Sequence, residues 1–107
     1  KIFIFFFFCI LSCVRMVMGI SAKFNNGIYP LEITAHAQAR MLERQVSVEL
    51  LVFIVETGEM KVKPQQVNAF WVFAEIPGRV DNLVCVSLVI ESTNLVIKTV
   101  LINWRPL

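Results

Sequence analysis

The sequence lacks the charge imbalance that is typical of nucleic-acid-binding proteins. Ten Lys and Arg residues stand against eight Asp and Glu residues, which gives a formal net charge of +2 over 107 residues. Lys1 and Arg15 supply the two extra cations, so the chain from Lys23 onward is close to neutral. A near-neutral domain has no bulk basic surface for nucleic acid, and any phosphate binding must therefore be local.

Cysteine is also scarce. Of the three cysteines, Cys9 and Cys13 lie in an apolar N-terminal stretch, which leaves Cys85 alone in the rest of the chain. A single cysteine cannot form an internal disulfide, and no Cys/His spacing is typical of a zinc site. Cys85 alternates with Val84 and Val86, which indicates a small buried side chain. The sequence predicts neither a metal nor another cofactor.

The N-terminal stretch itself is strongly apolar. Residues 2–14 (IFIFFFFCILSCV) are apolar except for Ser12. This run is shorter than the roughly 20 apolar residues that span a membrane, but it has the length of the apolar region of a secretory signal. Small residues follow, and they predict cleavage after Gly19 or Ala22. We therefore expect a leader over residues 1–22 and a protein that is secreted or anchored to the membrane through this segment.

Another start of translation is an alternative. If Met16 or Met18 is the true start, the Phe-rich stretch is not part of the protein, and the protein is cytoplasmic.

Residues 23–30 contain two Asn, a Gly and a Pro, which favour turns and predict a linker. Residues 31–107 are then a single domain, the only reasonable count for a chain of this length.

Two helices are expected at the start of this domain. Thr34 is a good N-cap before residues 35–44, most of which favour helix. Residues 48–57 (VELLVFIVET) are apolar at nearly every position, so their periodicity does not separate helix from strand. Ser47 before them and Gly58 after them are the start and stop signals of a helix, and they decide the prediction.

Four strands are expected after the helices, over residues 59–63, 70–76, 83–90 and 95–102. The predicted fold class is α+β, with two N-terminal helices packed on one face of a four-stranded antiparallel sheet (ααββββ). Because two helices cover only one face, the other face should expose apolar residues of the central strands. An exposed apolar face usually marks an interface, which predicts a homodimer or another protein partner.

A ridge of basic residues lies on the first predicted helix. His36, the only histidine, is followed by Arg40 and Arg44 at spacings of four residues, which places all three on one side of the helix. An imidazole beside two guanidinium groups suits an acid–base group next to a phosphate clamp. The alternative is a solvated helix face whose arginines pair with Glu32 or Glu43.

This helix resembles a known family. Residues 33–44 (ITAHAQARMLER) are similar to the opening helix of the domain of unknown function 4258 family, which reads T-x-H-A-x-x-R-M-x-x-R. In that family a second helix ending in Gly follows, and a late strand carries V-x-x-T-V. Residues 47–58 match the second helix and residues 96–100 (VIKTV) match the strand. The resemblance covers essentially the whole domain.

The family has been grouped with the barnase, EndoU, colicin and RelE fold, which includes metal-independent ribonuclease toxins. The resemblance therefore implies a toxin-like domain that acts on RNA phosphodiesters, with His36, Arg40, Arg44 and Thr99 as its catalytic residues. His36 would accept the proton of a ribose 2′-hydroxyl, the arginines would neutralise the phosphate, and Thr99 would donate a hydrogen bond. Lys98 should point to the opposite face of the sheet from Thr99, because side chains alternate along a strand.

Two rival hypotheses stand beside the ribonuclease. In one, the domain is a non-catalytic protein-interaction module whose apolar sheet face is the interface. In the other, it is a periplasmic or lipid-anchored accessory protein, which depends on the leader. The position of Thr99 discriminates between enzyme and interaction module. A groove that holds Thr99 with His36 and Arg40 favours the enzyme, whereas a ridge that faces solvent far from the last strand favours the module.

Overall fold

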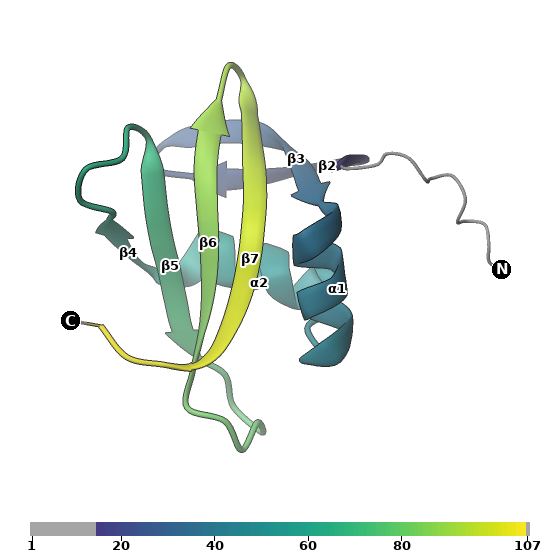
Figure 1. Cartoon of the computed structure of the whole chain (residues 1–107), viewed down its shortest axis with the longest axis vertical. Helices are drawn as coiled ribbons and strands as arrows, with labels where there is room; N and C mark the ends of the chain where they lie inside the picture. The colour runs from purple at the N-terminus through teal and green to yellow at the C-terminus, as the bar shows by residue number, and fades with distance from the viewer. Residues whose placement is uncertain (1–14, 107) are drawn as a thin grey trace, which may run out of the picture.

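The structure of this chain, a computed structural model, describes residues 15–106, with the side chains of the first strand described from residue 19 on. Two strands come first, then two helices, then four strands. These elements are β2 (Arg15–Phe24), β3 (Gly27–Thr34), α1 (Ala35–Glu43), α2 (Val48–Thr57), β4 (Glu59–Val62), β5 (Ala69–Glu75), β6 (Leu83–Glu91) and β7 (Asn94–Trp104). Figure 1 shows β5, β6 and β7 side by side, with α1 next to β7 and α2 behind the sheet.

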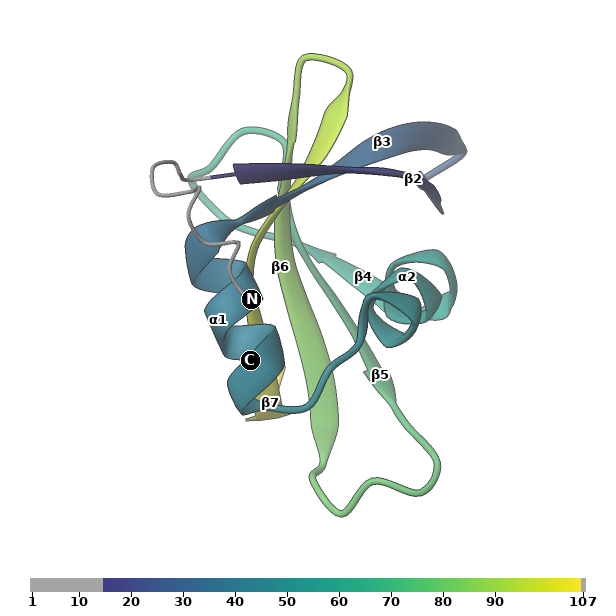
Figure 2. The same ribbon diagram turned by 90° about the vertical axis from the view of Figure 1, so that its right-hand side faces the viewer.

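The strands of the described residues form one mixed six-stranded sheet. Its order is β2-β3-β7-β6-β5-β4, so the last strand of the chain lies in the middle of the sheet beside β3. β3 and β7 run parallel, and the other neighbouring pairs are antiparallel. The sheet is strongly curled, since β2 and β3 cross the direction of β6 in Figure 2. The result is a half-barrel with the helices against it.

The predicted fold class, two N-terminal helices on one face of a four-stranded antiparallel sheet, is wrong. The sheet of residues 15–106 has six strands, and both helices follow the β2–β3 hairpin. The error lies in residues 23–30, which we expected to form a linker. Asn25 and Asn26 both have positive φ, 50° and 70°, and Phe24 pairs with Gly27. These are the features of a tight hairpin turn, so the turn-forming residues join two strands.

Burial explains why this hairpin belongs to the domain. Ala22, Phe24, Leu31 and Ile33 are buried, and they alternate with exposed or half-buried neighbours. Alternation with a period of two is the pattern of a strand that packs one face on a core. The ring of Phe24 meets that of Phe70 edge-on, with centroids 5.2 Å apart. The hairpin therefore contributes directly to the hydrophobic core.

Both predicted helices are present and begin at the predicted caps. The Thr34 hydroxyl accepts a hydrogen bond from the backbone N–H of Ala37 at 3.0 Å, and the Ser47 hydroxyl accepts one from the N–H of Leu50 at 3.1 Å. Gly58 follows α2 and donates its N–H to the last turn. The four strands expected after the helices are also present, as β4 to β7, with their ends moved by a few residues.

The core lies between the two helices and one face of β5, β6 and β7, which we call the inner face. From the helices, Ala37, Met41, Leu51 and Ile54 are buried in it. The sheet contributes a set of aliphatic side chains from its three central strands. They are Val72, Val84, Val86, Leu88, Leu95, Ile97 and Val100.

The opposite face of β5, β6 and β7, which we call the outer face, looks toward the viewer in Figure 1. The Trp104 ring centroid lies 5.7 Å from that of Trp71 and 4.7 Å from that of Phe73. Cys85 and Ser87, on the central strand β6, are 0% and 3% exposed. Cys85 is therefore the buried side chain that the sequence predicted. The middle of the outer face is covered within the chain, so the central-strand residues expected to be exposed there are not.

The apolar stretch of residues 2–14, with Cys9 and Cys13, lies outside the described residues. In the part that the structure describes, no helix combines the length and the apolar character needed to cross a membrane. Both predicted cleavage points fall inside β2. A chain cut after Ala22 would keep only the last two residues of that strand.

Candidate functional site

α1 lies along the part of the β7 edge that β3 leaves unpaired. β3 pairs with β7 only at residues 95–97, and α1 then continues beside the rest of the strand (Figure 1). At the start of α1, the Thr34 hydroxyl donates to the backbone oxygen of Lys98 at 3.3 Å. At its end, Nη1 of Arg44 donates to the backbone oxygen of Val100. The two capping side chains of α1 thus bind edge carbonyls of β7 on either side of Thr99, which also protects this edge from pairing with another chain.

The bond from Arg44 ties the C-terminal end of the basic ridge to the edge of β7. His36 and Arg40 precede Arg44 by two turns and one turn of α1, on the same side of the helix. His36 is exposed and Arg40 is half-buried. Nη1 of Arg40 pairs with Oε1 of Glu43 at 2.5 Å, and these side chains are 32% and 57% exposed. The carboxylate partner that the alternative interpretation expected for an arginine is therefore present, in an exposed pair.

Thr99 faces the outer side of the sheet, between the two β7 carbonyls that Thr34 and Arg44 bind. β7 contains a bulge, because Lys98 is an extra residue between Ile97 and Thr99, which both pair with β6. Ile97 and Val100 are both in the core, so Lys98 and Thr99 both turn outward. Lys98 Nζ lies 3.9 Å from a carboxylate oxygen of Glu91. The prediction that Lys98 and Thr99 lie on opposite faces is wrong, since a bulge interrupts the alternation on which it depended.

Thr99 also ends a row of residues that crosses the outer face. Strand pairing sets Lys61 opposite Trp71, Trp71 opposite Ser87, and Ser87 opposite Thr99. Residues opposite each other in a sheet have Cβ atoms about 4.5–5.5 Å apart. We call these four residues the outer row. Lys63 reaches onto it from the end of β4, where its Nζ donates to the Ser87 hydroxyl and lies 5.5 Å from the centroid of the Trp71 ring.

Burial determines the electrostatics of this cluster. Desolvation lowers the pKa of Lys63, Cys85 acts to raise it, and the charge of Lys98 lowers it further. Burial raises the pKa of Cys85 to about 12, so its thiol stays protonated and unreactive at neutral pH. The outer face thus holds a partly desolvated cation beside an aromatic ring, with a second cation nearby.

Sequence reasoning assigned no site role to Lys63 or Ser87, and it favoured core packing over base stacking for Trp71 and its aromatic neighbours. Alternation along a strand could have put Trp71 on one face of β5 and Ser87 on one face of β6. The register that sets them opposite each other, and opposite Thr99, comes only from the strand pairing. Lys63 had no signal beyond its place at the end of a short edge strand.

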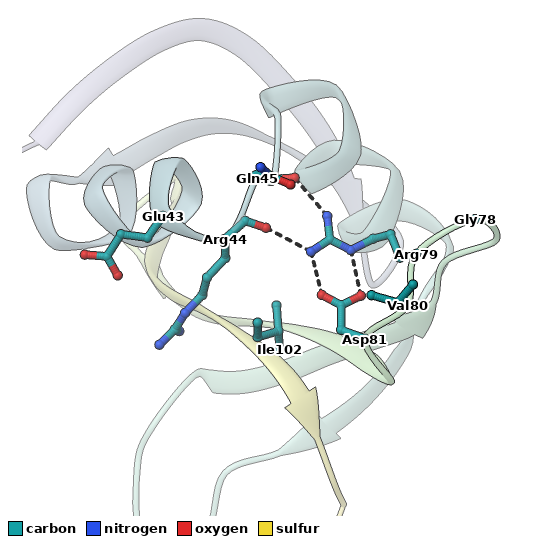
Figure 3. Close-up of a pocket in the computed structure, with 8 residues that line it drawn as sticks. All are labelled: Glu43, Arg44, Gln45, Gly78, Arg79, Val80, Asp81 and Ile102. Atoms are coloured by element: carbon teal, nitrogen blue, oxygen red, sulfur yellow. Dashed lines mark hydrogen bonds and ion pairs between the residues drawn. The ribbon is translucent and has the colours of Figure 1, made fainter.

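An open pocket of about 370 Å³ lies at the C-terminal end of α1, and Figure 3 shows its lining. Arg79 is one of the lining residues and connects several of the others. Its guanidinium donates to the backbone oxygens of Arg44 and Gln45, both at 2.8 Å, and to both carboxylate oxygens of Asp81, at 2.8 and 2.6 Å. The side-chain hydrogen bond between Arg79 and Asp81 raises the pKa of Arg79 and lowers the pKa of Asp81. In Figure 3 the Arg44 side chain points away from Arg79. The residues of this pocket therefore have a structural role, since their hydrogen bonds connect the β5–β6 loop to the end of α1.

The described residues offer no evident metal site. Between Arg15 and Pro106, no group of three or more His, Cys, Asp and Glu side chains is placed to hold a metal ion. The groups that the site does offer are an imidazole, guanidinium and ammonium cations, hydroxyls and an indole ring. Such groups bind anions and aromatic bases.

The fold is thus a small α+β domain with a curled mixed sheet and a basic helix beside its last strand. The family model described as domain of unknown function (DUF4258) matches residues 33–102, and the chain belongs to this family. The match confirms the resemblance drawn from the His-Arg-Arg helix and the VIKTV strand; the description assigns no activity, and the link to ribonuclease toxins lies beyond it. No curated protein and no solved structure matches the chain.

Proposed function

We propose that this domain cleaves RNA phosphodiesters without a metal ion, at the junction of α1 and β7. The observation that carries the proposal is the double attachment of α1 to β7. Thr34 and Arg44 bind the backbone on either side of Thr99, which attaches both ends of α1 to β7. In the proposal, His36, Arg40, Arg44 and the Thr99 hydroxyl meet one phosphate at this junction.

In the proposed reaction, His36 accepts the proton of a ribose 2′-hydroxyl. The 2′-oxygen attacks the adjacent phosphorus, the bond to the 5′-oxygen breaks, and that oxygen takes a proton from water. The products are a 2′,3′-cyclic phosphate and a 5′-hydroxyl end. Acid–base assistance of this kind contributes about 10²–10⁴ in rate, and one donor to the developing negative charge contributes about 10²–10³.

The arginines have the capacity for this role. Arg44 uses Nη1 for the backbone of β7, but a guanidinium has five N–H donors in all. Arg40 must leave Glu43 to meet a phosphate. An exposed ion pair contributes only about 0–1 kcal/mol, so a phosphate with its bidentate geometry can replace that carboxylate.

The test is cleavage of single-stranded RNA by the full chain in EDTA. We expect 2′,3′-cyclic phosphate ends from the wild type, a loss of about 10²–10⁴ in rate for His36→Ala, and no cleavage of the 2′-deoxy substrate. Glu49→Gln, an exposed change on α2, is the matched control and should cleave like the wild type. Equal rates for the wild type and His36→Ala, or cleavage by neither, would end the proposal.

A specific observation favours a second candidate, the non-catalytic interaction module. Both arginines of the ridge have partners within the chain, Glu43 for Arg40 and the backbone of Val100 for Arg44. In this candidate the ridge is structural, and the apolar surface that binds a partner includes Leu42, whose side chain is 84% exposed. The absence of RNA cleavage, with Leu42→Ser abolishing self-association or partner capture, would support it.

Secretion or membrane anchoring through the N-terminal segment stays a prediction. Mass spectrometry of the N-terminus of the expressed protein tests it. Because Gly19 and Ala22 lie inside β2, cleavage after Gly19 would remove half of the strand and cleavage after Ala22 most of it. An N-terminus at Met16 or Met18 would instead support the cytoplasmic alternative.

A further inference from the structure

We propose that single-stranded RNA runs along the outer row from the cleaved phosphate at Thr99, with Trp71 stacking on one base and Lys63 contacting a phosphate between Thr99 and Trp71. This inference rests on the proposed function, since it takes Thr99 as the position of the cleaved phosphate. It adds a nucleotide-binding subsite formed by residues outside the catalytic set.

The dimensions of the row suit a nucleotide strand. Adjacent strands in a sheet lie about 4.7–4.9 Å apart, so Trp71 is about 10 Å from Thr99 and Lys61 is about 14 Å from it. Stacked nucleotides advance by about 3.4 Å per step along one strand. The row begins at Thr99 and is long enough for more than one nucleotide. Ser87 in its middle is 3% exposed, so the nucleotides contact Trp71 and Lys63 rather than Ser87.

Trp71 is suited to base stacking because its ring is half-buried and held in place. Trp104 packs against it at 5.7 Å, with a tilt of 50° between the rings, and Lys63 Nζ lies over the ring, 5.5 Å from its centroid. A base would stack on the part of the ring that these two side chains leave open. A ring fixed in this way loses little conformational freedom when a base stacks on it. Stacking on an aromatic side chain is tolerant of sequence, because every base has a π-face. The subsite should therefore accept any base.

Lys63 supplies the cation. Its ammonium group has three N–H donors, one of which is bonded to Ser87, so the group is positioned in advance. The titratable groups that act on it are Cys85 and Lys98, and neither is a carboxylate. Lys63 differs in this from Arg40, which must first release Glu43. A phosphate arriving at Lys63 therefore meets an ammonium group that has lost part of its water.

The test measures binding of a fluorescent single-stranded RNA octamer in EDTA to the full-length His36→Ala protein, by anisotropy. In that background, Trp71→Ala should weaken binding about 5- to 140-fold, the range expected for one stacked base, while Trp71→Phe keeps a ring and should stay close to the parent. Lys63→Met should weaken binding and reduce the slope of log affinity against log salt by about one. Thermal unfolding of each variant checks that it is folded.

Substrate length separates this subsite from the catalytic proposal. With the wild-type His36 restored, Trp71→Ala should raise KM for the octamer and leave cleavage of a dinucleotide unchanged, because a dinucleotide with its phosphate at Thr99 does not reach Trp71, about 10 Å away. Octamer binding by Trp71→Ala and Lys63→Met equal to the parent would overturn the subsite and leave cleavage intact. If the wild type does not cleave RNA but octamer binding still depends on Trp71, the catalytic proposal alone is overturned. Failure of the parent to bind RNA would overturn both.

Discussion

Replacing Arg79 by Ala should release the β5–β6 loop from the end of α1. Its guanidinium is the only group that joins Arg44, Gln45 and Asp81 in Figure 3, through contacts of 2.6–2.8 Å. The carbonyl oxygens belong to the end of a helix, where cations are favoured. The substitution therefore removes a bidentate ion pair and a helix cap together.

The magnitude follows from burial. The side chains of Arg79 and Asp81 are 19% and 10% exposed, so water replaces the lost bonds only in part. Hydrogen bonds to charged groups contribute about 1.5–3 kcal/mol each when well shielded, and exposed ion pairs contribute about 0–1 kcal/mol. We expect a loss of about 2–3 kcal/mol in the free energy of unfolding. For a domain of this size that corresponds to a fall of about 8–24 °C in Tm.

Urea and thermal unfolding followed by circular dichroism measure this loss. Arg79→Lys keeps the charge but not the fork of donors, so it should recover less than half of the stability. The pKa of Asp81 is lowered in the folded state, so its contribution is present above about pH 4 and is lost as the pH falls through the folded pKa. The difference between wild type and Arg79→Ala should therefore shrink in acid. A difference below about 0.5 kcal/mol at pH 7, or one unchanged down to pH 2, would refute the reasoning.

Three further predictions concern the strand at the start of the domain, the buried thiol and the ridge. A chain of residues 23–107, which lacks most of β2, should have a Tm about 10 °C or more below that of residues 15–107, measured by thermal unfolding. In the chain of residues 15–107, which keeps Cys85 alone, a thiol reagent should label the protein only after unfolding, because the pKa of that thiol is raised to about 12. Glu43→Gln should free Arg40 and tighten RNA binding up to about 5-fold by anisotropy, whereas unchanged binding would show that Arg40 does not meet the phosphate.

Local signals were enough to predict the helices. The caps Thr34 and Ser47 make the hydrogen bonds that their sequence positions indicated, and they resolved the ambiguous apolar segment that became α2. The strands after α2 followed from their apolar runs and from the turns between them. These features depend on neighbours within a few residues, which a sequence displays directly.

The features that were missed depend on distant partners. Asn25-Asn26-Gly27 is as compatible with a linker as with a hairpin, and only the burial of Phe24 and Leu31 against the rest of the chain distinguishes them. The parallel pairing of β3 with β7 joins segments more than 60 residues apart. The bulge at Lys98 is likewise visible only against β6.

The candidate site divides in the same way. Helical spacing was enough to align His36 with Arg40 and Arg44, and the family resemblance added Thr99. The contacts that attach α1 to β7, and the outer row with Lys63, required the tertiary structure. Residues on one helix or strand can be grouped from the sequence, whereas residues from different elements that meet on one surface can be grouped only from the structure.

The central claim is that the ridge and Thr99 act on the same phosphate. Single-turnover cleavage of RNA in EDTA tests it with Thr99→Val, which removes the hydroxyl, beside Thr93→Val, the same change in the β6–β7 turn. We predict that Thr99→Val slows cleavage about 10²–10³-fold and that Thr93→Val cleaves like the wild type. Equal rates for the two variants, or a wild type that does not cleave RNA, would contradict the account.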